Sequence, residues 1–143
     1  MKILGIDYGM KKIGLAISDE NHTLAFPKEI VRNDSNTFSR ISEIIKTDKI
    51  QEIVVGESVD FKGKPNALST RIEIFISMLR KEFKLPIHKQ KEFLTSMEAR
   101  RSLINKGKLN SSQAHSKIKQ IKSGHMDAKA AAIILQRYLD KIN

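Results

Sequence analysis

Apolar residues recur along the chain with two spacings, one typical of strands and the other typical of helices. Short apolar or β-branched runs, closed by glycine, proline or polar residues, predict strands at 2–7, 13–18, 23–31, 50–55 and 85–88. Apolar residues three and four positions apart predict helices at 39–46, 68–83, 97–105 and 126–142. Three strands followed by helices that alternate with further strands indicate an α/β domain, a mixed sheet with helices packed on its faces.

The order of these elements predicts how the sheet is connected. A tight turn separates the first two strands, so we expect an antiparallel hairpin in which Gly9 can take a positive φ. Pro27 favours an edge position for the third strand. Helices separate the later strands, which should therefore run parallel and be joined by right-handed crossovers.

The composition indicates a single domain and excludes several classes of protein. The chain has 143 residues, enough for one domain with its own core. It has no cysteine, which excludes a disulfide framework, Cys-ligated zinc, iron–sulfur clusters and thiol catalysis. No apolar run approaches the roughly 20 residues of a membrane span, and the start of the chain becomes acidic too soon for a secretory signal. We expect one cytoplasmic domain over residues 1–143, with no membrane partner.

Positive charge is concentrated in one segment of the chain. The net charge is +10, and residues 80–124 contain 12 basic and three acidic side chains. Such a basic stripe is typical of a surface that binds nucleic acid, and a solvated surface that maintains solubility is the alternative. Aromatic residues are scarce in the stripe, so we expect recognition of backbone and shape rather than stacking on bases. The polar residues 108–124 predict a mobile basic loop.

Four acidic residues end or follow expected strands, or lie in the first turn of an expected helix, where functional groups collect in α/β sheets: Asp7, Glu57, Glu92 and Asp127. The small residues Ala130 and Ala131 would let the last helix approach the sheet closely. Carboxylates gathered in one place repel one another, and a divalent cation such as Mg²⁺ removes that penalty. Two such ions can hold the attacking and leaving oxygens of a phosphodiester displacement. Taken alone, an acid at the end of a strand is more often a turn former or a cap than a metal ligand. Asp127 alone is also explained as a partner of the helix dipole, and Glu92 as half of a surface salt bridge.

Four motifs resemble the YqgF/RuvX family, which comprises Holliday-junction-resolvase-like nucleases of the ribonuclease H superfamily implicated in maturing the 5′ end of pre-16S ribosomal RNA. The motifs are GIDYG (5–9) with KIGLA (12–16), IVVG (53–56), EFLTSMEA (92–99) and MDAKAAAIILQ (126–136). Their order and spacing extend the resemblance over essentially the whole chain. It implies a ribonuclease H-like fold, with a five-stranded mixed sheet of order 3-2-1-4-5, an antiparallel second strand and helices on both faces.

The resemblance also implies an activity and a set of site residues. It implies a nuclease that uses Mg²⁺ or Mn²⁺, with two ions, and in which Asp7, Glu92 and Asp127 are the catalytic metal ligands. The expected substrate is structured RNA, namely the 5′ end of pre-16S rRNA in a pre-ribosomal particle. The alternatives are a four-way DNA junction and, from another class, a non-catalytic RNA-binding assembly factor. A junction resolvase needs paired active sites, so monomer and homodimer both stay open.

The chain departs from the family pattern around the expected site. Met10 replaces a Thr, Glu57-Ser58 replaces Leu-Pro, Lys91 replaces an Asp and Phe93 replaces an Arg. Because one acid is lost at position 91 and one is gained at 57, we hypothesise that Glu57 supplies a compensating metal ligand. Lys91 would instead contact phosphate. The cations expected to bind the nucleic-acid backbone are Lys11, Lys12, Lys91, Arg100, Arg101, Lys106, Lys108, Lys117, Lys119 and Lys122.

Overall fold

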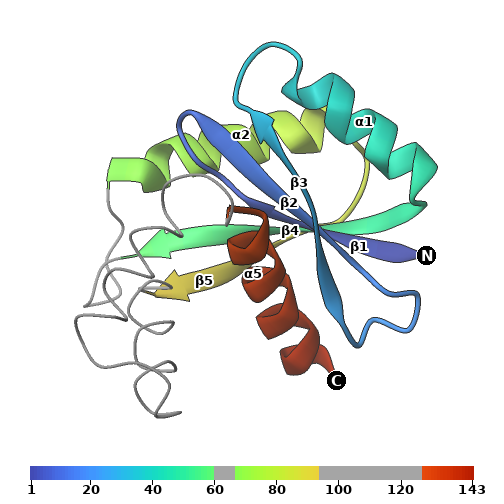
Figure 1. Ribbon diagram of the computed structural model, residues 1–143. Helices are drawn as coiled ribbons and strands as arrows, with labels where there is room; N and C mark the ends of the chain where they lie inside the picture. Colours follow the sequence, from blue (N-terminus) through green and yellow to red (C-terminus); the bar gives the residue numbers. More distant parts are fainter. Residues whose placement is uncertain (60–66, 94–126) are drawn as a thin grey trace.

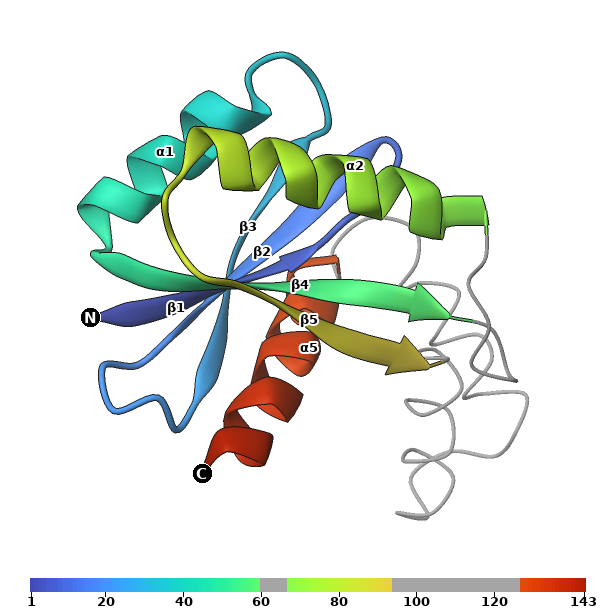
Figure 2. The ribbon, with the colours of Figure 1, turned by 180° about the vertical axis from the view of Figure 1, so that it is seen from behind.

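The computed structural model describes residues 1–59, 67–93 and 127–143, and its description leaves out the side chains at 58, 59, 67, 92, 93 and 127. The strands are β1 (Lys2–Asp7), β2 (Lys12–Ser18), β3 (Ala25–Arg32), β4 (Ile50–Val59) and β5 (Ile87–Phe93). The helices described are α1 (Thr37–Thr47), α2 (Ala67–Glu82) and α5 (Asp127–Ile142). α1 and α2 cover one face of the sheet and α5 crosses the other (Figure 1, Figure 2). The expected helix at 97–105 and the expected loop at 108–124 lie outside the described residues.

The strands form one sheet in the order β3-β2-β1-β4-β5, which confirms the expected order. β2 runs antiparallel to both β1 and β3, whereas β4 runs parallel to both β1 and β5. β1, β3, β4 and β5 therefore end, and β2 begins, at the same end of the sheet. We call it the carboxyl end, and it is where functional groups collect in sheets of this kind.

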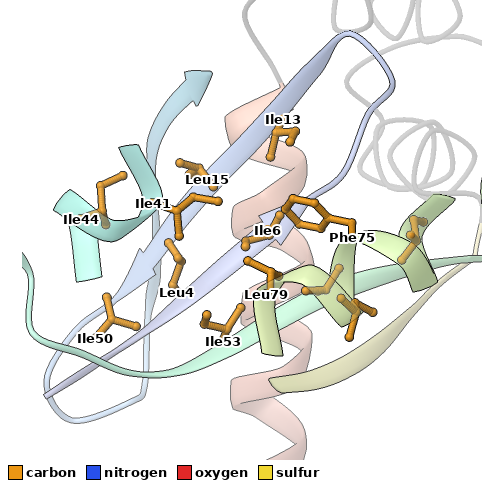
Figure 3. Close-up of a cluster of buried hydrophobic side chains, with 13 residues drawn as sticks. Leu4, Ile6, Ile13, Leu15, Ile41, Ile44, Ile50, Ile53, Phe75 and Leu79 are labelled. Carbon is orange, nitrogen blue, oxygen red and sulfur yellow. The ribbon is translucent and has the colours of Figure 1, made fainter. Parts of the chain in front are cut away.

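Successive residues of each strand alternate between the two faces of the sheet, and both faces are apolar. On β1, Leu4 and Ile6 belong to the core under α1 and α2, whereas Ile3 belongs to the core under α5. The first core also contains Phe75 and Leu79 of α2 (Figure 3). Burial of each such large side chain stabilises the fold by about 1.5–3 kcal/mol. The two sides are called the α1/α2 face and the α5 face below.

Two strands are longer than the sequence predicts. β4 continues to Val59 instead of ending at residue 55, and β5 spans Ile87–Phe93 instead of 85–88. The parallel pairing of the two strands continues without a shift to its last pair, Val59 with Phe93. Hydrogen bonds between the strands thus extend the sheet through polar residues whose own propensity does not favour a strand. As a result, Glu57 and Glu92 lie within strands rather than after them.

The edge position expected for β3 is confirmed, and the prediction of a positive φ at Gly9 is wrong. The register between β2 and β3 shifts at Pro27, as is common where proline removes a ladder donor. The φ of Gly9 lies outside the left-handed region. Glycine is needed there for space, because an added Cβ would lie 2.3 Å from the carbonyl oxygen of Lys12. Within residues 1–59, 67–93 and 127–143, no helix is long and apolar enough to cross a membrane.

Candidate active site

Asp7 is the last residue of β1, the central strand of the sheet. Alternation along β1 places it in phase with Ile3, on the α5 face. The next residue, Tyr8, packs into the opposite core, where its ring centroid lies 4.9 Å from that of Phe75. The fold therefore presents a partly buried carboxylate on the α5 face at the carboxyl end of the sheet.

The C-terminal half of α5 is tied to the β2–β3 loop, at the other end of the sheet. The Ala25 N–H donates to Gln136 Oε1 at 2.9 Å, and Gln136 Nε2 donates to the Thr23 carbonyl at 2.9 Å. Asn143 Nδ2 donates to the His22 carbonyl at 2.7 Å. α5 therefore runs from the carboxyl end of the sheet toward the opposite end (Figure 1). The amide of Gln136 fixes the position of this helix along its axis.

α5 also packs directly on the backbone of β1. An added Cβ at Gly5 would lie 2.8 Å from Leu135 Cβ and 3.2 Å from the Ala131 carbonyl oxygen. Ala131 is fully buried, as expected for a small residue that lets the helix approach the sheet closely. The helix rises about 6 Å from Ala131 to Asp127, and the strand advances about 7 Å from Gly5 to Asp7. The backbone of α5 therefore begins on the face of Asp7 and at the same end of the sheet.

β5 contacts α5 through His88, whose ring stacks on that of Tyr138 with centroids 5.2 Å apart. His88 Nε2 also lies 3.7 Å from Glu52 Oε2 on β4. Burial raises the pKa of Tyr138, and the neighbouring Glu52 carboxylate raises it further. These contacts place His88 on the α5 face, and alternation places Gln90 on the same face.

Gln90 and Asp7 are at the same level of the sheet, on either side of Gly56. Gly56 pairs with Gln90, and it follows the pair formed by Ile6 and Val55. Glycine adds no side chain between them. Gln90 Oε1 is buried and has no hydrogen-bond partner among the described residues. Carboxylate and amide oxygens suit Mg²⁺ and Mn²⁺, so the donor chemistry at this place fits a divalent cation.

Glu92 and Asp127 are placed by their backbones alone. Glu92 pairs with Ser58, two positions beyond Gln90 along β5, and Asp127 is the first residue of α5. Their side chains lie outside the described residues, so their role as metal ligands stays a prediction. Among the side chains that the structure does describe, no three His, Asp or Glu groups gather to hold a metal ion.

Glu57 lies on the opposite face of the sheet from Asp7. It is in phase with Ile53 and Val55, which belong to the core under α1 and α2. Its partner in the β4–β5 register is Lys91. The sheet separates the Glu57 side chain from that of Asp7, so this placement gives no support to Glu57 as a compensating ligand.

Three of the cations expected to bind nucleic acid are described, and all three are exposed: Lys11, Lys12 and Lys91. Both Lys11 and Lys12 come soon after Asp7. Lys11 lies in the turn between β1 and β2, and Lys12 is the first residue of β2. Lys91 lies on the α1/α2 face, as does Lys89, which forms an ion pair with Glu73 of α2. The other expected cations lie outside the described residues: Arg100, Arg101, Lys106, Lys108, Lys117, Lys119 and Lys122.

Comparison with known proteins assigns the chain to a family. The family model described as "RuvX: Holliday junction resolvase" matches residues 1–141. The chain belongs to the RuvX family. Relatives from Maridesulfovibrio salexigens and Thermoanaerobacter pseudethanolicus, both named "Putative pre-16S rRNA nuclease", are 32% and 35% identical to it. The alignments cover 97% and 98% of this chain, and 98% and 96% of the two relatives.

Solved structures of resolvases share the fold of this RuvX-family chain. Thermus thermophilus RuvC in complex with a Holliday junction substrate matches it with a TM-score of 0.55 at 17% identity, over 99% of this chain and 96% of that one. The fowlpox virus resolvase in complex with Holliday junction DNA matches with a TM-score of 0.52 at 12% identity, over 99% of both chains. At these identities the similarity shows the fold, and it confirms the ribonuclease H-like architecture.

Three residues at the carboxyl end of the sheet in this RuvX-family chain are not evident as site residues from its sequence: Arg32, Asn33 and Gln90. Gln90 lies just beyond the strand expected at 85–88, and a correct end for β5 would have placed it on the α5 face. Arg32 and Asn33 come close to the site only through the pairing of β2 with β3. No local sequence signal marks such a contact between strands.

Proposed function

We propose that this chain is a divalent-metal-dependent nuclease that hydrolyses phosphodiester bonds in structured RNA, at the 5′ end of pre-16S rRNA during ribosome assembly. The proposal rests on one observation: Asp7, Gln90 and the first turn of α5 share one face at the carboxyl end of the sheet. The names of the relatives support the choice of pre-16S rRNA as substrate.

Asp7 is the central metal ligand in this proposal. Together with Glu92 from β5 and Asp127 from the start of α5, it would hold the divalent ions. Bound Mg²⁺ or Mn²⁺ would offset the repulsion among the carboxylates and stabilise the charge that develops on the phosphodiester group. The proposal leaves Glu57 out, because it lies on the other face of the sheet.

The basic residues bind and orient the nucleic acid in this proposal. Lys11, Lys12 and Lys91, together with the cations between residues 100 and 122, contact phosphates. Such contacts supply affinity and fix the position of the strand without reading its bases. Specificity would then come from the folded shape of the RNA, as is common for proteins that contact RNA helices.

A four-way DNA junction is the alternative substrate, favoured by the description of the family and by the two resolvases that share the fold. Competition between a labelled junction and an unlabelled precursor-rRNA fragment, at one salt concentration, distinguishes the two substrates. If the unlabelled RNA displaces the labelled junction more strongly than the unlabelled junction does, the result supports the proposal. Weak competition, together with a dimer in solution, supports the junction.

The direct test is the substitution Asp7→Asn, assayed for cleavage of a precursor-rRNA fragment with Mg²⁺ or Mn²⁺. Cleavage should be abolished while RNA binding is retained or strengthened, because a negative charge facing phosphate is removed. Asp140→Asn, at the other end of α5, is the matched control and should cleave normally. Unchanged cleavage by Asp7→Asn would refute the site. RNA binding by the wild-type chain without metal-dependent cleavage would instead indicate a non-catalytic assembly factor.

A further inference from the structure

Two cations from neighbouring strands lie on the α5 face, at the same end of the sheet as Asp7. Lys12, the first residue of β2, is directly opposite Arg32, the last residue of β3. On β2, Ile13 belongs to the α1/α2 core, and Ala16 belongs to the α5 core, which puts Lys12 on the α5 face. On β3, Val31 packs against the α1/α2 core, which puts Arg32 on the α5 face as well.

These positions form a row that leads away from Asp7 across the carboxyl end of the sheet. Asp7 pairs with Gly14, two residues along β2 from Lys12. Neighbouring strands are about 4.8 Å apart, so the β3 backbone that carries Arg32 lies about 10 Å from β1. A nucleic-acid strand whose reacting phosphate lies at Asp7 would therefore have its next phosphates within reach of the Lys12 and Arg32 side chains.

Neither cation has an ion-pair partner within the part of the chain that the structure describes. Other basic side chains do: Lys28 lies 3.3 Å from Asp48, and Arg40 pairs with Glu29. Lys12 and Arg32 are both exposed. Like charges directly opposite each other on adjacent strands destabilise a sheet. An anion bound between them would offset that cost, so the pair favours an anionic ligand at this place.

The turn that carries Lys12 is fixed in place before any ligand binds. The Asn33 N–H donates to the Lys11 carbonyl at 2.9 Å, and Asn33 Nδ2 donates to the Gly9 carbonyl at 2.9 Å. One residue after Arg32 thus ties the β1–β2 turn to the end of β3. A preformed site loses less conformational entropy on binding, which favours affinity.

We infer that Lys12 and Arg32 form a clamp for successive phosphates of the nucleic-acid strand that leaves Asp7 toward β3. The ligand is the phosphodiester backbone, and the clamp does not select bases. Asn33 is its positioning residue. This inference rests on the proposed function and adds to it the path of the bound strand over β2 and β3.

The test compares two double variants of the full chain that remove equal charge. Lys12→Gln with Arg32→Gln removes the clamp. Lys46→Gln with Lys141→Gln, on exposed parts of α1 and α5 away from the carboxyl end, is the control. The dissociation constant for a precursor-rRNA fragment is measured by fluorescence anisotropy over a range of salt concentrations. Each variant carries Asp7→Asn, so that the RNA stays intact.

Loss of two phosphate contacts should lower the slope of log affinity against log salt by about 1.4–1.8, and weaken binding on the order of tenfold to a hundredfold near 0.1 M salt. The control should change the dissociation constant by less than about threefold. Asn33→Ala keeps both charges, so it should weaken binding while leaving the salt slope unchanged. Thermal unfolding of each variant shows whether it is folded. If a double variant does not fold, its two single substitutions are measured separately instead.

The outcomes separate the clamp from the proposed function. Equal effects of the two double variants, in a chain whose wild type binds and cleaves RNA, would overturn the clamp and leave the nuclease proposal intact. A wild-type chain that neither binds nor cleaves RNA would overturn both. A lower salt slope confined to the Lys12 and Arg32 variants would support the clamp.

Discussion

Glu57 and Lys91 are register partners in the parallel pairing of β4 with β5, on the face of the sheet that Asp7 does not share. The family resemblance implies that both positions depart from the usual pattern, one by gaining an acid and the other by losing one. The structure places the two departures beside each other, with opposite charges, as neighbours on the α1/α2 face. Opposite charges thus adjoin on this face of the sheet, on the side away from Asp7.

Glu57→Gln should consequently leave metal-dependent cleavage within about twofold of wild type, whereas Asp7→Asn should abolish it. A double-mutant cycle of Glu57→Gln and Lys91→Gln, measured by urea unfolding, should give a coupling free energy of at most about 1 kcal/mol, as is typical of opposite charges at the protein surface. A loss of cleavage by Glu57→Gln as large as that by Asp7→Asn would instead restore Glu57 as a metal ligand.

The close packing of α5 on β1 predicts that Gly5 tolerates no side chain. Gly5→Ala would bring a Cβ within 2.8 Å of Leu135 Cβ, so the helix must shift away from the strand. The cost of such overpacking is about 1–3 kcal/mol of unfolding free energy, which urea unfolding measures. Because the same shift moves the start of α5, the affinity for Mn²⁺ should also fall. Unchanged stability would contradict the packing described for Gly5.

The sheet could be predicted from the sequence where hydrophobic pattern alone determines it. β1 is found with its expected bounds, because its apolar run is bounded by a lysine and an acid. The ends of β4 and β5 could not be predicted, since polar residues there are held in strands by pairing with each other. Strand pairing depends on residues distant in the sequence, and local propensity does not report it.

Some features of the candidate site could also be predicted from the sequence, and others could not. Asp7 could be found because it ends an apolar strand and belongs to a recognisable motif. The face on which each acid lies could not, since a one-residue error in strand phase reverses the face. The sequence therefore suggested Glu57 as a ligand, while the alternation of β4 places it away from Asp7. Arg32 was missed because only the pairing of β3 with β2 brings it near Lys12.

The hydrogen bonds of the Asp19 carboxylate should make the free energy of unfolding smaller in acid. The Thr23 hydroxyl and then the backbone N–H groups of Thr23 and Leu24 donate to its carboxylate, and they hold the pKa of Asp19 below its usual value of 3.8. Because the folded pKa is the lower one, this stabilisation is present above pH 3.8 and is lost as the pH falls through the folded pKa. Thermal unfolding of wild type and Asp19→Ala should therefore differ at neutral pH and converge in acid. Parallel curves would contradict this role.

Substitution of Gln90 tests whether the α5 face binds metal, because it separates Mn²⁺ affinity from stability. Its buried Oε1 has no hydrogen-bond partner among the described residues, at the level of Asp7 across Gly56. Leucine removes a buried oxygen that has no partner among the described residues, so Gln90→Leu should unfold at about the same urea concentration as wild type or a higher one. If the oxygen faces the ions, the same variant should bind Mn²⁺ more weakly by calorimetry. Gln51→Leu, near the other end of the sheet, is the control and should bind Mn²⁺ as wild type does. Equal Mn²⁺ affinity in all three chains would show that Gln90 does not face the metal site.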